Sequence, residues 1–219
     1  MAAKRRTPVY LEAGHKRVFA CAVDWPGWSR SGSNEVTAIE TLAAYAPRYA
    51  RAASRAGVRV PAITAADLDI VERLTGNATT DFGAPNLVAA VDKARLDAAA
   101  ASRIVALVIA AWDELDAVVA AAPATLRKGP RGGGRDRDAV YAHVAEAERS
   151  YARKIGIGLT ATEWRDGHVA LLRERIADTL RRARGGKAPG EHGWPPRYMA
   201  RRMAWHALDH AWEIEDRSA

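Results

Sequence analysis

The C-terminal two thirds of the chain carries apolar residues at the spacing of an amphipathic helix. They recur every three or four positions from residue 87 onward, and segments rich in proline and glycine interrupt the pattern. It predicts helices over residues 91–121, 136–155, 163–183 and 195–216. Four helices joined by loops of such lengths indicate a helix bundle.

The N-terminal part has a different pattern. Residues 9–13 and 17–24 are short extended runs on either side of a glycine-histidine turn, which predicts a β-hairpin. Asn34 or Ser33 then caps an amphipathic helix that extends to about residue 56. Pro47 lies inside this helix and predicts a kink or an earlier end.

Between these two parts the pattern is less regular. Residues 58–63 indicate a third strand, residues 65–74 a short helix or strand, and residues 76–83 a polar loop. The predicted fold class is therefore mostly α. A small α/β module (residues 1–86) precedes a four-helix bundle (residues 87–219).

Composition limits the number of domains and the cellular compartment that we expect. The chain has 219 residues, 48% of them hydrophobic, which is enough for one large domain or two small ones. Its single cysteine, Cys21, excludes an internal disulfide framework and fits a reducing cytoplasm. The basic N-terminus lacks the apolar segment of a signal peptide, and no apolar run reaches the roughly 18–20 residues of a membrane span. We expect a cytoplasmic protein with no membrane partner.

The net charge of +7 raises the question of nucleic-acid binding. The arginines are scattered, and no zinc finger, basic-zipper heptad or aromatic RNA-stacking motif accompanies them. We therefore expect no specific nucleic-acid partner. An anionic small-molecule substrate or a solvated basic surface explains the charge better.

Three histidines carry the strongest chemical signal. His206 and His210 lie four residues apart on the last predicted helix, so their imidazoles point the same way from adjacent turns. His143 lies on the apolar stripe of the second bundle helix. Together they would give a metal ion three nitrogen ligands and one open position, as in catalytic sites. The alternative is three separately hydrogen-bonded histidines.

The segments around these histidines resemble the DinB/YfiT superfamily of four-helix metalloproteins. The similarity covers roughly residues 87–217, with "AHVAEAERSY" supplying His143 and "RRMAWHALDHAWEIEDR" supplying His206 and His210. The resemblance implies a divalent ion such as zinc or nickel, with open positions for water or a substrate thiolate. The superfamily includes thiol-dependent transferases and mycothiol-dependent maleylpyruvate isomerases. The N-terminal module and the arginine- and glycine-rich loop "LRKGPRGGGR" depart from its pattern.

The N-terminal segment resembles the small HicB fold of antitoxin type. The similarity covers roughly residues 10–49, within "KRVFACAVDWPGWSRSGSNEVTAIETLAAYAPRYA". There a strand ending in Asp-x-Pro-Gly is followed by a turn and a helix. Such modules bind a partner protein or pack as an accessory layer. The DNA-binding part found in some HicB-like proteins has no counterpart here.

Three further residues are candidate catalytic groups beside the metal. Glu213 and Glu146 each lie about one turn beyond a histidine, where they would accept a ligand N–H or carry protons. Each is equally consistent with an ordinary surface carboxylate. Arg202, one turn before His206, would hold a substrate carboxylate or pair with Glu146.

These observations predict a metal-dependent enzyme, a thiol-dependent transferase or a hydrolase acting on a small molecule. A low-molecular-weight thiol is a candidate co-substrate, and pairing through helices makes a homodimer an open alternative. The competing function is a non-catalytic interaction protein, in which the HicB-like module binds a partner and the bundle is a scaffold.

Overall fold

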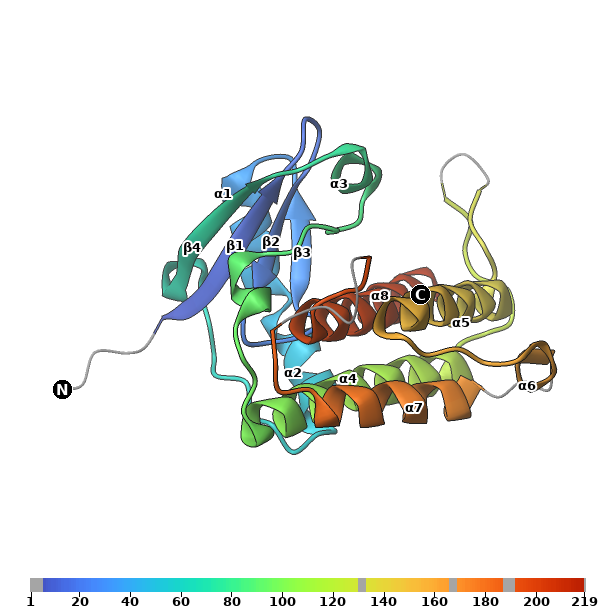
Figure 1. The fold of residues 1–219 in the computed structure, drawn as a ribbon. Coiled ribbons are helices and arrows are strands. Elements are labelled where there is room, and N and C mark those ends of the chain that lie inside the picture. Colours follow the sequence, from blue (N-terminus) through green and yellow to red (C-terminus); the bar gives the residue numbers. More distant parts are fainter. Residues whose placement is uncertain (1–5, 130–132, 166–168, 187–191, 219) are drawn as a thin grey trace.

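The protein is mostly helical with one small mixed sheet (Figure 1). The computed structural model describes residues 6–129, 133–165, 169–186 and 192–218. In these ranges the strands are β1 (Thr7–Ala13), β2 (Val18–Ala22), β3 (Ser29–Gly32) and β4 (Leu68–Thr75). The helices are α1 (Glu35–Ala44), α2 (Ala46–Ser54), α3 (Ala78–Phe82), α4 (Ala98–Ala121), α5 (Arg137–Ala152), α6 (Ala161–Arg165), α7 (Val169–Arg182) and α8 (Pro196–Ser218). Single 3₁₀ turns span Ala65–Asp67, Ala90–Lys93 and Arg153–Ile155.

The sheet has the strand order β3-β2-β1-β4. The predicted hairpin is confirmed, since β1 and β2 pair antiparallel. The predicted strand over residues 58–63 is wrong: this stretch is coil, and Pro61 within it has no N–H for a ladder. The chain instead forms β4, which pairs parallel with β1 and resolves the open helix-or-strand alternative for residues 65–74. β3, with the polar sequence Ser-Arg-Ser-Gly, was not predicted.

The two faces of the sheet meet different neighbours. Because successive strand residues point to opposite faces, Val9 and Leu11 join the main hydrophobic cluster with α1. Tyr10 and Cys21 point the other way and form a second, smaller cluster with Trp205 of α8. The sheet therefore packs on α8 one residue before the first candidate metal ligand of that helix.

The first helix ends early, as its proline predicted. Asn34 caps α1 by accepting a hydrogen bond from the Thr37 N–H (2.9 Å). The helix stops at Ala44, and Pro47 lies in the first turn of α2, where the missing N–H has no cost.

The four long helices pack side by side (Figure 1). α8 contacts α4 and α5, and α7 lies against α4. α4 is shorter than predicted: it begins after the cap Asp97, and part of the preceding stretch forms a 3₁₀ turn. The predicted helix over residues 163–183 includes residues 166–168, which lie outside the described ranges; α6 and α7 flank them. The predicted polar loop over residues 76–83 contains the short α3.

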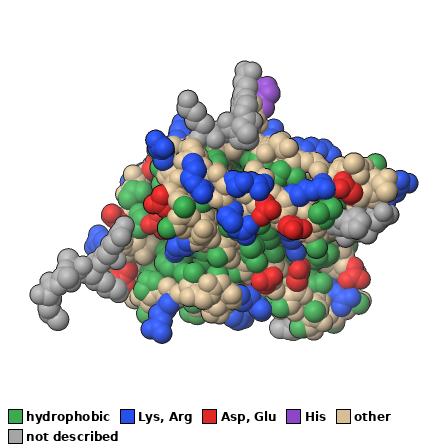
Figure 2. Space-filling model, turned by 60° about the horizontal axis from the view of Figure 1, so that its bottom comes forward, with side chains coloured by type: hydrophobic (Ala, Val, Ile, Leu, Met, Phe, Trp, Pro, Cys, Tyr) green, Lys and Arg blue, Asp and Glu red, His purple; other side chains and the backbone are tan. Residues whose placement is uncertain are grey.

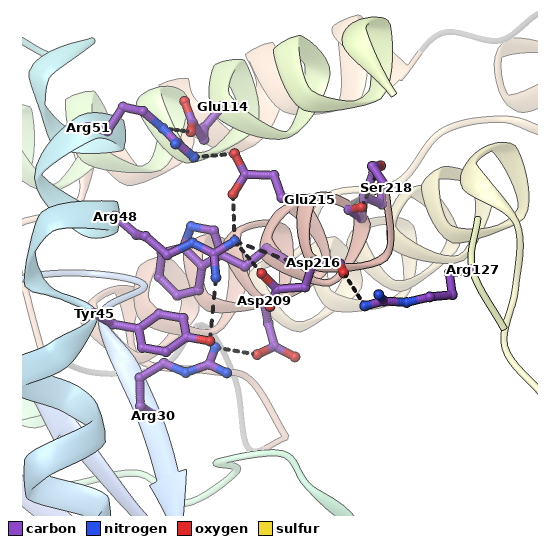
Figure 3. Close-up of polar contacts among 12 residues, drawn as sticks. Arg30, Tyr45, Arg48, Arg51, Glu114, Arg127, Asp209, Glu215, Asp216 and Ser218 are labelled. Carbon is purple, nitrogen blue, oxygen red and sulfur yellow. Dashed lines mark hydrogen bonds and ion pairs between the residues drawn. The ribbon is translucent and has the colours of Figure 1, made fainter. Parts of the chain in front are cut away.

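Ion pairs join the N-terminal part to the long helices (Figure 3). Arg51 donates to the buried Glu114 of α4 (2.6 Å) and also to Glu215 of α8. Arg48 pairs with Glu215 (2.7 Å), and Arg30 of β3 pairs with Asp209 of α8 (2.7 Å). One hydrophobic cluster extends through both parts of the chain. The division at residue 86 stays a prediction.

None of the helices in the described ranges combines the length and hydrophobicity that a membrane span requires. On the face shown in Figure 2, lysine and arginine side chains are spread among acidic and apolar ones.

Candidate metal centre

The three histidines converge at the contact between α5 and α8. One candidate ligand atom from each of His143, His206 and His210 lies within 4.8 Å of the other two. The ring centroids are 5.1 Å apart for His143 and His206, 5.0 Å for His143 and His210, and 4.7 Å for His206 and His210. Residues more than sixty positions apart in the chain thus meet as the sequence predicted. In the described residues they form a group that could hold a metal ion.

The spacing suits a small cation after modest side-chain adjustment. Ligand nitrogens at about 2.0–2.1 Å from a tetrahedral zinc ion lie roughly 3.3 Å from one another. Two of the three ligands are fixed by a single rigid helix, and the third comes from a helix packed against it. Small rotations of the imidazole rings would therefore suffice to close the remaining gap.

Burial favours the neutral form of His206 and His143, which is the form that binds a metal. Desolvation lowers the pKa of His206 well below its usual value, and the nearby His210, Arg202 and His143 lower it further. The pKa of His143 is also lowered, first by burial and then by His210 and Arg135. Neutral imidazoles offer a lone pair at physiological pH, so no ligand proton has to be displaced there.

A buried nitrogen without a partner provides the test of fit. The Nδ1 atom of His206 is inaccessible to solvent, and no described residue hydrogen-bonds to it. Such an atom is costly unless something else satisfies it. The site also consists of three histidines, the ligand type that zinc and nickel favour. On both counts the residues fit a divalent ion.

Glu213 orients one of the ligands. Its carboxylate lies 2.7 Å from the Nδ1 atom of His210 and also accepts a hydrogen bond from Arg217 (2.7 Å). Because a carboxylate only accepts, Nδ1 carries a proton, and Nε2 is the nitrogen of His210 that would bind a metal. The hydrogen bond from His210 is the main reason that the pKa of Glu213 is lowered, which keeps this carboxylate ionised.

Glu146 lies elsewhere. Its carboxylate accepts a hydrogen bond from the Trp164 indole (2.9 Å) and lies 3.5 Å from Arg149. Among the described residues, none of its hydrogen bonds or ion pairs is with a histidine. The spacing along the helix put Glu146 near His143, but the side chain turns outward to α6.

Arg202 lies beside the histidines without pairing with Glu146. It donates to the Tyr151 hydroxyl (3.1 Å) and to the Pro85 carbonyl (3.1 Å). Its guanidinium also lies 4.7 Å from the Trp205 ring centroid. The predicted ion pair with Glu146 is therefore wrong, because Arg202 is already held by α5 and by the segment before α4. No described carboxylate neutralises Arg202, so its charge is left for a ligand.

The sequence did not predict that Tyr151 lies beside His206 and accepts a hydrogen bond from Arg202. Its ring centroid lies 5.8 Å from that of His206 and 5.1 Å from that of Trp194. Tyr151 is eight residues after His143 on the same helical face, a signal that was available. The Pro85 carbonyl had no such signal, since only the path of the chain brings it to Arg202.

Asp209 is not a fourth ligand. It lies between the two histidines of α8 in sequence but pairs with Arg30 on another side of the helix. The candidate metal centre in the described residues therefore consists of His143, His206 and His210. Comparison of the whole chain with protein-family models, characterised proteins and solved structures finds no significant match to any of them.

Proposed function

We propose that this chain is a DinB-like metalloprotein in which α4, α5, α7 and α8 form the four-helix bundle. His143, His206 and His210 would hold one divalent ion, zinc or nickel. The observation that carries the proposal is the convergence of three imidazoles from two helices, one with an unsatisfied buried nitrogen. A three-histidine set leaves coordination positions open, which is typical of catalytic sites.

The proposed activity is that of a thiol-dependent transferase or a hydrolase acting on a small molecule. When bound, a divalent ion lowers the pKa of a coordinated water or thiol, so that a nucleophile exists at neutral pH. Glu213 holds His210 in the tautomer that leaves Nε2 free. Arg202 presents an unneutralised guanidinium next to His206 and would hold a carboxylate of the substrate or thiol. Glu146 has no role in this arrangement.

Elemental analysis of the purified protein tests the metal site. We expect about one zinc or nickel ion per chain and loss of the ion in a His206→Ala/His210→Ala variant that keeps the wild-type circular dichroism spectrum. His15→Ala is the matched control, because His15 is an exposed histidine in the β-hairpin turn. This control should retain the full metal content.

A thermal-shift screen separates the possible activities. Low-molecular-weight thiols, added to metal-loaded protein, should raise the melting temperature if thiols bind the ion. A thiol effect that disappears in the histidine variant would support the transferase. Loaded protein without any thiol effect would argue against the transferase and leave the hydrolase and the non-catalytic scaffold. A wild type that folds fully without metal and binds none after zinc or nickel is added would contradict the proposal and favour the non-catalytic interaction protein.

A further inference from the structure

A second site lies on another side of α8. A cleft with a volume of about 490 Å³ lies where β1 meets the N-terminal turns of α4 and α8. This volume is in the range of small-molecule sites. Its lining carries four arginines, Arg6, Arg103, Arg197 and Arg201, and one acidic residue, Asp24.

Arg103 and Arg197 have no acidic partner in the described residues. Arg103 donates to the backbone carbonyl of Asp24 (2.6 Å) and lies 4.5 Å from the Trp25 ring centroid. Arg197 donates only to the Arg95 carbonyl, at 3.5 Å, and its Nε is buried without a hydrogen-bond partner in the described residues. Neither forms an ion pair with a described carboxylate. A guanidinium in this state retains both its charge and free N–H donors.

The other charges of the cleft do not cancel this surplus. Arg201 is neutralised by Asp92, which accepts hydrogen bonds from its Nε (3.0 Å) and its Nη2. Arg6 is exposed and has no described acidic partner. Asp24 is the one carboxylate of the lining, against three arginines that have no acidic partner in the described residues. The cleft is therefore positive.

The helices add to the positive field. Arg103 lies in the second turn of α4, and Arg197 and Arg201 lie in the first two turns of α8. Helix N-termini carry partial positive charge. At α4 the Asp97 carboxylate accepts the Ala100 N–H (2.7 Å) and offsets part of this charge, so α8 contributes more of the field. Two long helices therefore begin at the cleft that collects the unpaired guanidiniums.

We propose that this cleft binds a small organic oxyanion, a molecule with carboxylate or phosphate groups. Planar guanidiniums form paired hydrogen bonds with both groups. Arg197 and His206 are nine positions apart on α8, about two and a half turns, so their side chains leave opposite sides of the helix. The cleft and the candidate metal centre therefore lie on opposite sides of α8. Binding in the cleft does not depend on the metal. A nucleic acid would instead need basic residues in a row along the surface, not in a confined cleft.

Isothermal titration calorimetry with pyrophosphate and with citrate tests the proposal and distinguishes the two ligand chemistries. At least one of the two should bind with a Kd below about 1 mM. The tighter binder identifies phosphate or carboxylate as the preferred group. The titrations are made with the protein as purified and repeated with the folded His206→Ala/His210→Ala variant, so that chelation of a bound ion by either anion is distinguished from binding in the cleft.

Arg197→Gln is the primary variant, because the Arg197 guanidinium makes a single long hydrogen bond to a carbonyl and its loss should leave the fold intact. We expect its affinity to fall at least about tenfold, and that of Arg103→Gln likewise. Arg59→Gln is the matched control: it removes an exposed arginine outside the cleft, and its affinity should stay within about twofold of wild type.

Three results would overturn the proposal. The first is the absence of binding by either anion. The second is unchanged affinity in Arg197→Gln and Arg103→Gln. The third is tight binding of a labelled DNA duplex that both variants lose and that excess pyrophosphate and citrate do not displace, which would make the cleft part of a nucleic-acid surface.

Discussion

Single contacts decide how well each histidine is prepared for a metal. His210 has Glu213 as a partner for its non-ligating nitrogen, whereas no described residue hydrogen-bonds to either nitrogen of His206, so nothing there holds the nitrogen that an ion would leave free. A partner of this kind fixes the ring and the tautomer, and it raises the basicity of the ligand. His210 is therefore held in place by a hydrogen bond, whereas His206 is not.

Glu213→Gln tests this support. The amide cannot accept as a charged group, and its NH₂ competes for the place of the carboxylate, so we expect metal affinity to fall by about 10–100-fold. Competition with a chromophoric chelator measures the change. Glu40→Gln, an exposed glutamate on α1, is the control and should bind like wild type. Equal affinities for the two variants would contradict the assigned role of Glu213.

Cys21 gives a second prediction at this scale. The thiol is fully buried beside Tyr10, and burial is the main reason that its pKa is raised to about 11. Since the thiolate is the reactive form, Cys21 should not react with a thiol reagent at pH 8 while the protein is folded. The same reagent should label it completely in concentrated urea. Rapid labelling of folded protein would contradict the buried position.

At the element scale, ion pairs hold α2 against α4. Glu114 of α4 is almost completely buried (1% exposed) and accepts hydrogen bonds from Arg51 (2.6 Å) and Arg55 (2.7 Å). The two arginines are partly exposed, which weakens their charge interaction through solvent screening. The buried carboxylate nevertheless depends on them, because few other groups can satisfy it there.

Glu114→Gln should lower the free energy of unfolding by about 1–3 kcal/mol, the cost of losing charged hydrogen bonds at a buried group. Urea titration followed by circular dichroism measures it. Glu35→Gln is the matched control, since Glu35 pairs with Arg73 at the surface and should change stability by less than about 1 kcal/mol. A larger loss of stability in Glu35→Gln than in Glu114→Gln would show that burial of the carboxylate does not determine the size of the effect.

At the scale of the whole molecule, the sheet and the long helices share one core. The main hydrophobic cluster includes residues of β1 and α1 together with residues of α4 and α8. The smaller cluster joins Cys21 of β2 to Trp205 of α8. Neither part can lose its structure without exposing apolar surface of the other.

The chain should therefore unfold in a single cooperative transition. Helical circular dichroism reports mainly the long helices, whereas the reactivity of Cys21 reports the sheet. Coincident urea midpoints for the two signals are the expected result, as in two-state unfolding. Separate midpoints would show that the α/β module and the helices unfold independently.

Helix positions could be predicted because they depend on local periodicity. The ranges of α5 and α8 and the shared face of His206 and His210 follow from spacing within one segment. The end of α1 before Pro47 likewise follows from the chemistry of one residue. The strands were predicted less well, because pairing between distant segments determines where a strand forms. β3 is short and polar and was not predicted, and β4 is a strand because it pairs in parallel with β1.

The candidate site likewise has features that follow from local spacing and features that depend on packing. By itself the sequence determined which side chains can act as ligands and which two share a helical face. Tertiary structure alone decided that α5 brings His143 to that face, that Glu146 turns away to Trp164, and that Arg202 is held by the Pro85 carbonyl. The physical reason is range: helical spacing is set by bonds between near neighbours, whereas these contacts depend on how separate elements pack.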